Sequence, residues 1–550
     1  MKKTILVLIL LAILGSGAYY LFRTYGPTNP ARYLPESTIA YASFNDIPRS
    51  ARRWQQTELA KISEEPSVRE FLKKPLEKLG EAGKNEAEAI LREIKPSRLF
   101  CAVTSIQATN ISWVGGFQYY GGTKSLQHAL DRLREHLNSA LPLAEHTVSQ
   151  YEGVEITKSQ HGLLTLFTAT KGVWCFLSND EKALHEVLDR HAGRNTTPAF
   201  STNADFQKGL AELPRDPDFT GYLNVQPLLE TLLTTGKSLG ATANPRQEEQ
   251  ARKVKSISSS FKIDGPILRD SFFVQTTDIS TSRFEHKTIH YTTPETLLYY
   301  GAQFKWPNLQ DGVTAFIPAN ILTSLTEQHL ETVNLTEVFG PEFGLSVSWP
   351  QSKFTPELLI SIPLVNPDVA KKLIETVSAS VFPQMIVSDD ANAHYYSYPS
   401  VSNPLLNPSL AITKDFLLFG MTDAEVHAAA AKSADSPNLE TSPNFQTIKN
   451  IYQDANESFG YIDSKVVFDR GYNALKPVLT FGAAMMPAIA EYIDTAKLPD
   501  SSAISAHLTP ITIDQRRVPG GVFMESSGPV TLHQFCLISA GAWLASRPKP

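Results

Sequence analysis

The chain has 550 residues, of which 42% are hydrophobic and 19% are charged, and its formal net charge is −6 at pH 7. This length exceeds what one ordinary hydrophobic core supports, so two or three globular domains are predicted, and the composition excludes a disordered chain. Nucleic-acid binding is disfavoured, because no long run of Lys and Arg is present to neutralise phosphates.

The first segment of the chain has the pattern of an export signal. Two lysines precede an apolar run over residues 5–22, which is interrupted only by a few small residues. A run of this length can span the hydrocarbon core of a bilayer, and the positive-inside rule keeps the lysines in the cytoplasm. We therefore predict a signal anchor over residues 1–25, with its transmembrane helix over residues 5–22. The alternative is a secreted protein that is cleaved at Ala18.

Beyond the anchor, a Pro-rich linker over residues 26–32 leads into the strand pattern LPESTIAYASF at 34–44. The spacing of apolar residues and the turn signals predict the elements that follow. In chain order these are helices over 50–79, strands over 99–106 and 111–120, an amphipathic helix over 125–137, a strand over 154–156, a hairpin turning at 170–172, a helix over 227–233 and a hairpin around Asp264-Gly265.

The stretch from residue 166 to 223 recurs between 410 and 462, which indicates an internal duplication. The first strand pattern recurs as well, as TPETLLYYGAQF at 293–304. The matched positions are Pro35 and Pro294, Glu36 and Glu295, Tyr41 and Tyr300, Thr170-Lys171 and Thr413-Lys414, Phe176 and Phe419, Asp180 and Asp423, Phe206 and Phe445, and Gly221-Tyr222 and Gly460-Tyr461. Asp180 and Asp423 are each predicted to cap the N-terminus of a helix.

The duplication predicts the domain organisation. A first repeat over 33–280 and a second over 293–527 are joined by a connector at 281–292, and a C-terminal helix or tail follows at 528–550. Because strands and helices mix without strict βαβ alternation, we predict the α+β class, with two tandem lobes of antiparallel sheet and helices.

The three cysteines are too few for a disulfide framework. Cys101 and Cys175 lie in apolar, strand-like runs, so we predict that they are buried free thiols. Whether either of them or Cys536 forms a disulfide is left open.

Candidate sites for chemistry are weak. The sequence has no nucleophile elbow and no zinc-protease, paired-cysteine, phosphate-loop or dinucleotide motif. His286 and His290 are the best metal candidates. If residues 285–291 form a strand, the two stand about 13 Å apart, too far to share one ion. On a helix they could share one, but the surrounding residues are not typical of a helix. The stretch Asp389-Asp390-Ala391-Asn392 lacks the glycine and the later glutamate of a calcium loop. We therefore predict no catalytic residue, no metal site and no cofactor.

The two Gly-Tyr pairs are open to two interpretations. Gly221-Tyr222 and Gly460-Tyr461 are either duplicated ligand contacts or packing positions, and glycine inside a strand favours packing. Polar residues that could do chemistry are not kept between the copies, since Glu155, His161 and His191 have no counterpart of the same kind. A duplicated active site is expected to keep at least one such pair, so binding is favoured over catalysis.

Five stretches resemble a known family. They are LPESTIAYASF at 34–44, Trp54-x-x-Thr57-x-Leu59, Pro66-x-Val68-x-x-Phe71-Leu72, YEGVEI at 151–156 and ESSGP at 525–529. In these stretches the chain resembles a bacterial envelope family, domain of unknown function 3352. The resemblance implies an exported, membrane-anchored protein, and it brings no activity, ligand or catalytic residue.

We expect a single-pass protein of the inner membrane, held by its N-terminal helix, with the bulk of the chain in the periplasm. The expected function is a non-catalytic binding or scaffold module of the cell envelope. Its expected partners are envelope proteins or an apolar ligand, and not nucleic acid. Two alternatives stay open: a hydrolase with a site between the two repeats, and a carrier of a lipid or another apolar ligand.

Overall fold

The computed structural model describes residues 29–80, 92–107, 110–140, 145–162, 164–195, 197–238, 245–277, 284–304, 306, 323, 325–328, 330, 333–350, 352–353, 355–381, 384–398, 407–485, 494–531 and 534. The predicted signal anchor, most of the C-terminal tail and Cys536 lie outside these residues. None of the described helices combines the length and the apolar character that crossing a membrane requires.

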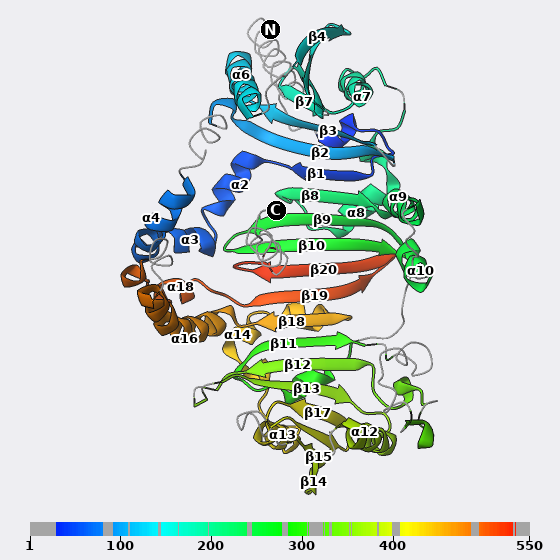
Figure 1. The fold of residues 1–550 in the computed structure, drawn as a ribbon, viewed down its shortest axis with the longest axis vertical. Helices are drawn as coiled ribbons and strands as arrows, with labels where there is room; N and C mark the ends of the chain where they lie inside the picture. The colour runs from blue at the N-terminus through cyan, green and yellow to red at the C-terminus, as the bar shows by residue number, and fades with distance from the viewer. Residues whose placement is uncertain are drawn as a thin grey trace, which may run out of the picture. The chain divides into compact units, whose positions relative to one another are not determined.

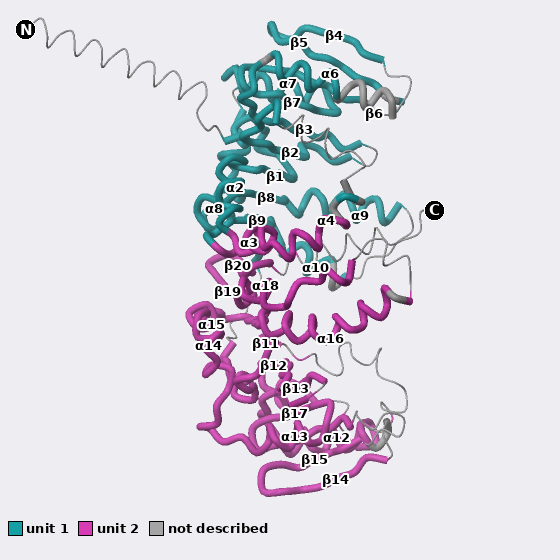
Figure 2. Tube along the Cα trace, turned by 90° about the vertical axis from the view of Figure 1, so that its left-hand side faces the viewer, with its two compact units in different colours: residues 1–56, 75–265, 270–278 teal, residues 57–74, 266–269, 279–550 magenta. Residues whose placement is uncertain are grey.

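The described residues form helices and antiparallel strands, which confirms the predicted α+β class with antiparallel sheets. They divide into two compact units (Figure 2). Unit 1 comprises residues 1–56, 75–265 and 270–278, and unit 2 comprises residues 57–74, 266–269 and 279–550. The repeat boundaries expected from the sequence stay a prediction.

Unit 1 is built on an antiparallel sheet (Figure 1). Its strands pair in the order β4-β5-β6-β7-β3-β2-β1-β8-β9. The elements are η1 (Pro30–Tyr33), β1 (Ala40–Phe44), α2 (Ile47–Trp54), β2 (Pro96–Gln107), β3 (Asn110–Tyr119), α6 (Thr123–Ala140), β4 (Glu145–Tyr151), β5 (Val154–His161), β6 (Leu164–Lys171), β7 (Trp174–Ser178), α7 (Glu181–His191), η2 (Phe200–Thr202), α8 (Ala204–Glu212), β8 (Phe219–Asn224), α9 (Val225–Ser238), α10 (Pro245–Lys253) and β9 (Val254–Asp264). The predicted hairpin at Asp264-Gly265 is confirmed, because β9 turns there into β10 (Ile267–Thr276).

Aromatic side chains form the main core of unit 1. Tyr41 on β1 and Tyr222 on β8 lie opposite each other and pack on Phe200 and Phe206. All four are at most 4% exposed. Buried aromatic rings in edge-to-face and offset contacts contribute more than their apolar area alone.

Unit 2 follows the same plan. Its strands pair in the order β14-β15-β16-β17-β13-β12-β11-β18-β19-β20, and the first nine of these match the order in unit 1. The elements are α3 (Glu58–Glu64), α4 (Pro66–Gly80), which ends in unit 1, η3 (Lys287–Tyr291), β11 (Thr296–Gln303), η5 (Leu335–Glu337), β12 (Glu342–Ser348), β13 (Glu357–Pro363), α12 (Pro367–Val381), β14 (Ile386–Asp389), β15 (Ala393–Ser397), β16 (Ser409–Thr413), β17 (Phe416–Gly420), α13 (Asp423–Ala430), η6 (Leu439–Thr441), α14 (Pro443–Gln446), α15 (Lys449–Asp454), β18 (Ser458–Ile462), α16 (Ser464–Met485), η7 (Thr495–Lys497), α18 (Ser501–Ser505), β19 (Ile511–Val518) and β20 (Gly521–Gly528).

The strand register corrects one of the matched pairs. Tyr41 lies opposite Tyr222 in unit 1, whereas the residue opposite Tyr461 in unit 2 is Tyr299. Tyr299 is 1% exposed and Tyr300 is 38% exposed. The match of Tyr41 with Tyr300 is therefore wrong by one residue, which in a strand is the difference between the two faces.

A second difference of one residue occurs at the helices that follow the hairpins β6–β7 and β16–β17. Asp180 caps α7 as predicted, accepting a hydrogen bond from Lys182 N at 3.0 Å. The cap of α13 is Thr422, not Asp423, whose carboxylate instead accepts hydrogen bonds from the hydroxyls of Ser397 and Ser409. The helix begins one residue earlier than expected because a threonine is also a good cap.

We predict that two phenylalanines of unit 2 respond differently to truncation. Phe445 is fully buried among Tyr452, Phe459 and Tyr461, so Phe445→Ala should lower the free energy of unfolding by about 3–5 kcal/mol. Phe481 is 69% exposed, and Phe481→Ala should change the free energy of unfolding by less than about 0.5 kcal/mol. Urea unfolding of the full chain measures both, and equal losses would contradict this assignment of the core.

Candidate functional site

The two histidines singled out in the sequence lie at a short helix and not in a strand. His286 precedes the 3₁₀ helix η3 with a φ of 62°, and His290 is in its last turn. Residues 287–291 thus form a short helix and not the strand considered above, and both histidines contact aromatic rings: His286 contacts Phe284 and Tyr452, and His290 contacts Tyr291. Within the part of the chain that the structure describes, no three His, Cys, Asp or Glu side chains are grouped to hold a metal ion.

The acidic stretch at 389–392 is a turn. Asp389 ends β14, and the carboxylate of Asp390 accepts hydrogen bonds from the backbone N–H of Asn392 and Ala393 and from the Tyr395 hydroxyl. These contacts explain the acidic residue at 390 through the local fold alone.

The Gly-Tyr pairs occupy packing positions. Tyr222 and Tyr461 are at most 4% exposed and belong to the two aromatic cores. A Cβ atom at Gly221 would come within 2.3 Å of Ser259 Oγ, so this position requires close approach of the neighbouring strand.

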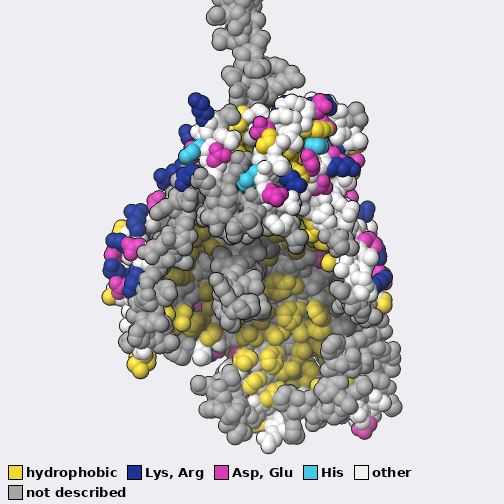
Figure 3. Space-filling model, turned by 45° about the horizontal axis from the view of Figure 1, so that its top comes forward, with side chains coloured by type: hydrophobic (Ala, Val, Ile, Leu, Met, Phe, Trp, Pro, Cys, Tyr) yellow, Lys and Arg dark blue, Asp and Glu magenta, His cyan; other side chains and the backbone are white. Residues whose placement is uncertain are grey.

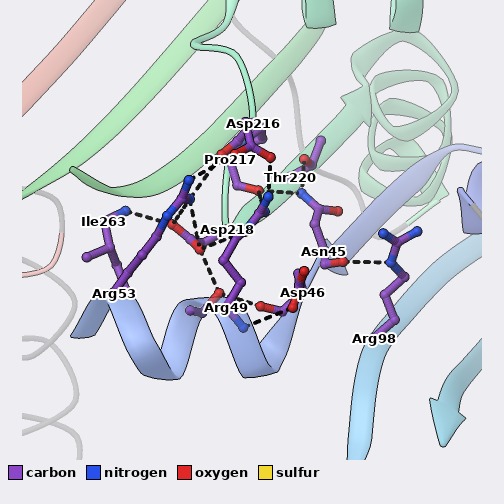
Figure 4. A network of polar contacts seen from close by, with 11 residues as sticks. Asn45, Asp46, Arg49, Arg53, Arg98, Asp216, Pro217, Asp218, Thr220 and Ile263 are labelled. Carbon is purple, nitrogen blue, oxygen red and sulfur yellow. Dashed lines mark hydrogen bonds and ion pairs between the residues drawn. The ribbon is translucent and has the colours of Figure 1, made fainter. Parts of the chain in front are cut away.

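One cavity of unit 1 has a wall of both polar and apolar side chains and a volume of about 600 Å³. Its wall carries Arg49, Arg98 and Asp216, together with Asn45 (Figure 4). Sequence inspection missed this group because its members come from residues 45–53, 98 and 216–220, which are far apart in the chain.

A buried carboxylate organises the side chains at this cavity. Asp218 is 1% exposed and accepts hydrogen bonds from Ser50 Oγ at 2.7 Å, Ile263 N at 2.8 Å and Arg53 Nη1 at 3.2 Å. The exposed Asp216 forms ion pairs with Arg49 and Arg53. Buried charges require partners of this kind.

The asparagine of the network joins three segments. Asn45 Nδ2 donates to the carbonyl of Pro217 at 3.0 Å and to Thr220 Oγ1 at 2.9 Å. The backbone carbonyl of Asn45 accepts from Arg98 Nε at 2.6 Å. The polar groups of this cavity thus bind one another and fasten α2 to the start of β8, which is a structural task.

A second cavity of unit 1 is apolar and has a volume of about 720 Å³. It lies on the face of β2 and β3 opposite the aromatic core, because Leu99 and Cys101 alternate along β2 with the core residues Phe100 and Ala102. The residues of β3 and β7 on its wall include Trp113, Gly115, Phe117 and Leu177. The volume falls within the range of about 300–1,000 Å³ typical of ligand sites.

The apolar cavity is incompletely covered by protein. Helix α6 covers part of the same face, where Leu126 and Ala129 pack on Tyr119 and Cys175. Beside it, Leu99 keeps 38% of its surface exposed. Exposed apolar surface in a concave site is unfavourable in water at about 25 cal/mol per Å², and a ligand that covers it removes this cost.

The two described cysteines differ in their surroundings. Cys175 is fully buried, which confirms the prediction for that residue. Cys101 is an exposed free cysteine at the apolar cavity, so the prediction of a buried thiol is wrong there. Its strand is apolar on both faces, and only one face meets the core. Partial burial still raises the pKa of the Cys101 thiol above its usual value.

We predict that Asp218 and Asp216 differ in their effect on stability. Asp218→Ala leaves Arg53 and the N–H of Ile263 without their buried partner and should lower the free energy of unfolding by about 2–4 kcal/mol. Asp216→Ala removes an ion-pair partner that is 56% exposed and should cost about 1 kcal/mol or less. Urea unfolding of the full chain tests the pair, and a larger loss for the Asp216 variant would refute the network as described.

We also predict selective alkylation of the cysteines. N-ethylmaleimide should modify Cys101 of the folded full chain much faster than Cys175, and the rate at Cys101 should keep rising above the usual thiol pKa of about 8.5. Peptide mass spectrometry follows each site separately, and unfolding in urea should make the two rates equal. Faster labelling of Cys175 in the folded chain would contradict the assigned faces.

Comparison with known proteins gives a family and no activity. No curated protein matches the chain. Solved structures of TP0453 in crystal forms III and I share 8% identity with it, cover 46% of this chain and 82% or 81% of their own, and superpose with TM-scores of 0.27 and 0.26. A likeness this slight carries no conclusion. The family described as "Protein of unknown function (DUF3352)" matches residues 124–489, well over half of the sequence, and the chain belongs to that family.

Proposed function

We propose that the chain is a membrane-anchored, extracytoplasmic binding protein of the bacterial envelope, and that it takes an apolar ligand in the cavity beside β2 and β3. The observation that carries the proposal is the apolar wall of this cavity, with Leu99 and Cys101 exposed on a strand whose other face is core. A strand surface of this composition is stabilised by an apolar partner.

The wall of the cavity also suggests the class of ligand. Among the described residues that line it, Arg92 is the one that carries a charge. A fatty acid or another acidic lipid combines an apolar chain with a group that a guanidinium attracts, so this class fits best.

The proposed location and origin rest on separate observations. The apolar run over residues 5–22 supports a signal anchor in the inner membrane with the bulk of the chain in the periplasm. The nine strands that follow one order in each unit support a tandem duplication of one lobe. The alternative of a hydrolase with a site between the two repeats stays a prediction.

The experiment uses a fatty acid that carries a photoactivatable diazirine, added to the full chain in lipid nanodiscs. We expect crosslinks to concentrate on peptides that contain 96–101 and 113–117. Gly115→Leu should lower the yield there about tenfold, because a leucine side chain at this wall position would fill part of the cavity. Its Cβ atom would lie 3.3 Å from the Phe100 carbonyl oxygen, a tight contact, so the fold of this variant has to be checked.

The matched control is Ile111→Ser, a change at an exposed position of the same strand that does not line the cavity. It should leave the yield unchanged. Should Gly115→Leu fail to fold, the same cavity can be blocked by alkylating Cys101 in the unaltered chain. Crosslinks that survive both changes would overturn the proposal.

A further inference from the structure

Unit 2 has a cavity at helix α16 and the loop that follows β12. Its volume is about 610 Å³, within the range of about 300–1,000 Å³ that is typical of ligand sites. The loop contributes Trp349 and Lys353 to the wall, and α16 contributes residues between 466 and 474. In the space-filling view hydrophobic side chains gather in patches (Figure 3), whereas the wall of this cavity combines an aromatic ring with charged and amide groups.

One side of α16 forms part of this wall. Its residues at the cavity are Val466, Asp469, Arg470, Asn473 and Ala474. Steps of three and four residues place them on one face of the helix. Asp469 and Asn473 are four residues apart, so their side chains are neighbours on the helix surface. A carboxylate and an amide therefore lie side by side at the cavity.

The Trp349 residue is held in place by two hydrogen bonds. Its Nε1–H donates to the carbonyl of Lys353 at 3.2 Å, and its backbone carbonyl accepts a hydrogen bond from Arg470. The Arg470 guanidinium also lies 6.0 Å from the centre of the indole ring. Because these contacts fix the ring at the cavity in the free protein, a ligand that stacks on it pays less entropy for ordering the site.

The charged and amide groups at the cavity differ in their partners. Lys353 forms an ion pair with Glu357, and Arg470 donates to the Trp349 carbonyl. Within the part of the chain that the structure describes, the side chains of Asp469 and Asn473 form no hydrogen bond or ion pair. The polar atoms of these two side chains are therefore available to a ligand.

These groups discriminate among classes of ligand. Lys353 is neutralised by its ion pair, and Arg470 and Asp469 carry opposite charges, so the wall has no net charge to attract an ion of either sign. A neutral molecule with several hydroxyls suits the site, because the Asp469 carboxylate accepts hydrogen bonds and the Asn473 amide both donates and accepts them. The negative face of the indole attracts the C–H groups of a sugar ring.

We propose that this cavity binds a neutral saccharide, with one sugar ring stacked on Trp349 and its polar groups bound to Asp469 and Asn473. Val466 and Ala474 add apolar surface to the same wall, which suits the acetamido methyl group of an N-acetylated sugar. The inference goes beyond the proposed apolar ligand, because the two cavities belong to different units and either proposal can fail without the other.

The test measures binding of tritiated chitotetraose, a neutral oligomer of N-acetylglucosamine, by equilibrium dialysis. The full chain is held in lipid nanodiscs, because detergents with sugar headgroups compete for such a site. We expect saturable binding that Trp349→Ala weakens at least about tenfold, since a buried tryptophan contact is lost. Trp349→Phe keeps an aromatic face and should retain most of the affinity.

Asp469→Ala separates recognition from folding. Because this side chain has no partner among the described residues, the variant should unfold at the same temperature as the unaltered chain. Its affinity for chitotetraose should fall about tenfold, because a charge-assisted hydrogen bond is lost. The matched control for the ring is Trp54→Ala, a change at a tryptophan that is 43% exposed and does not line the cavity, and it should leave the affinity unchanged.

Two sources of such a saccharide are distinguished by sedimenting the chain with purified cell-wall glycan. Retention that Asp469→Ala abolishes supports a wall-bound ligand, and binding of chitotetraose without retention supports a free oligosaccharide. No saturable binding of chitotetraose to the folded chain would overturn the proposal. Equal affinities of the unaltered chain and the Asp469→Ala variant would overturn it as well.

Discussion

The alternation of side chains across β2 and β3 is the constraint on which unit 1 depends. Because successive residues of a strand point to opposite faces, Phe100 and Ala102 enter the aromatic core only if Leu99 and Cys101 leave it. A soluble sheet normally places polar residues on the face that leaves the core. Here that face is apolar as well, and α6 covers only part of it. The candidate ligand site is a consequence of the same register that builds the core.

The sequence predicted the elements better than their register. Alternation identified the strands, and the two Gly-Tyr pairs lie on β8 and β18, whose tyrosines are buried in the aromatic cores. The match of Tyr41 with Tyr300 failed because two adjacent tyrosines occur at 299 and 300. Sequence identity alone does not tell which of the two side chains faces the core. Burial of Tyr299 decides it, and burial is a property of the folded sheet.

The candidate sites were harder to predict than the fold for two physical reasons. The polar network at Asp218 joins residues from distant segments, and only the pairing of β1 with β8 brings them together. The apolar cavity could not be predicted because of the composition of its own strand. The run LFCAVTSI at 99–106 has the composition of a strand that is buried on both faces, so Cys101 was expected to be buried. An apolar strand that lacks cover on one face has the same sequence pattern as one that has it.

Polar and apolar features of this protein call for different explanations. Asp218, Asp390 and Asp423 each have hydrogen-bond partners that account for them through the local fold. The exposed apolar residues have no such account, because leaving them in water lowers stability without a compensating contact. Folding alone would favour polar residues at Leu99 and at Phe481. The concave surface beside β2 and β3 is the one for which we propose an apolar ligand, because such a ligand would remove the cost of leaving Leu99 in water.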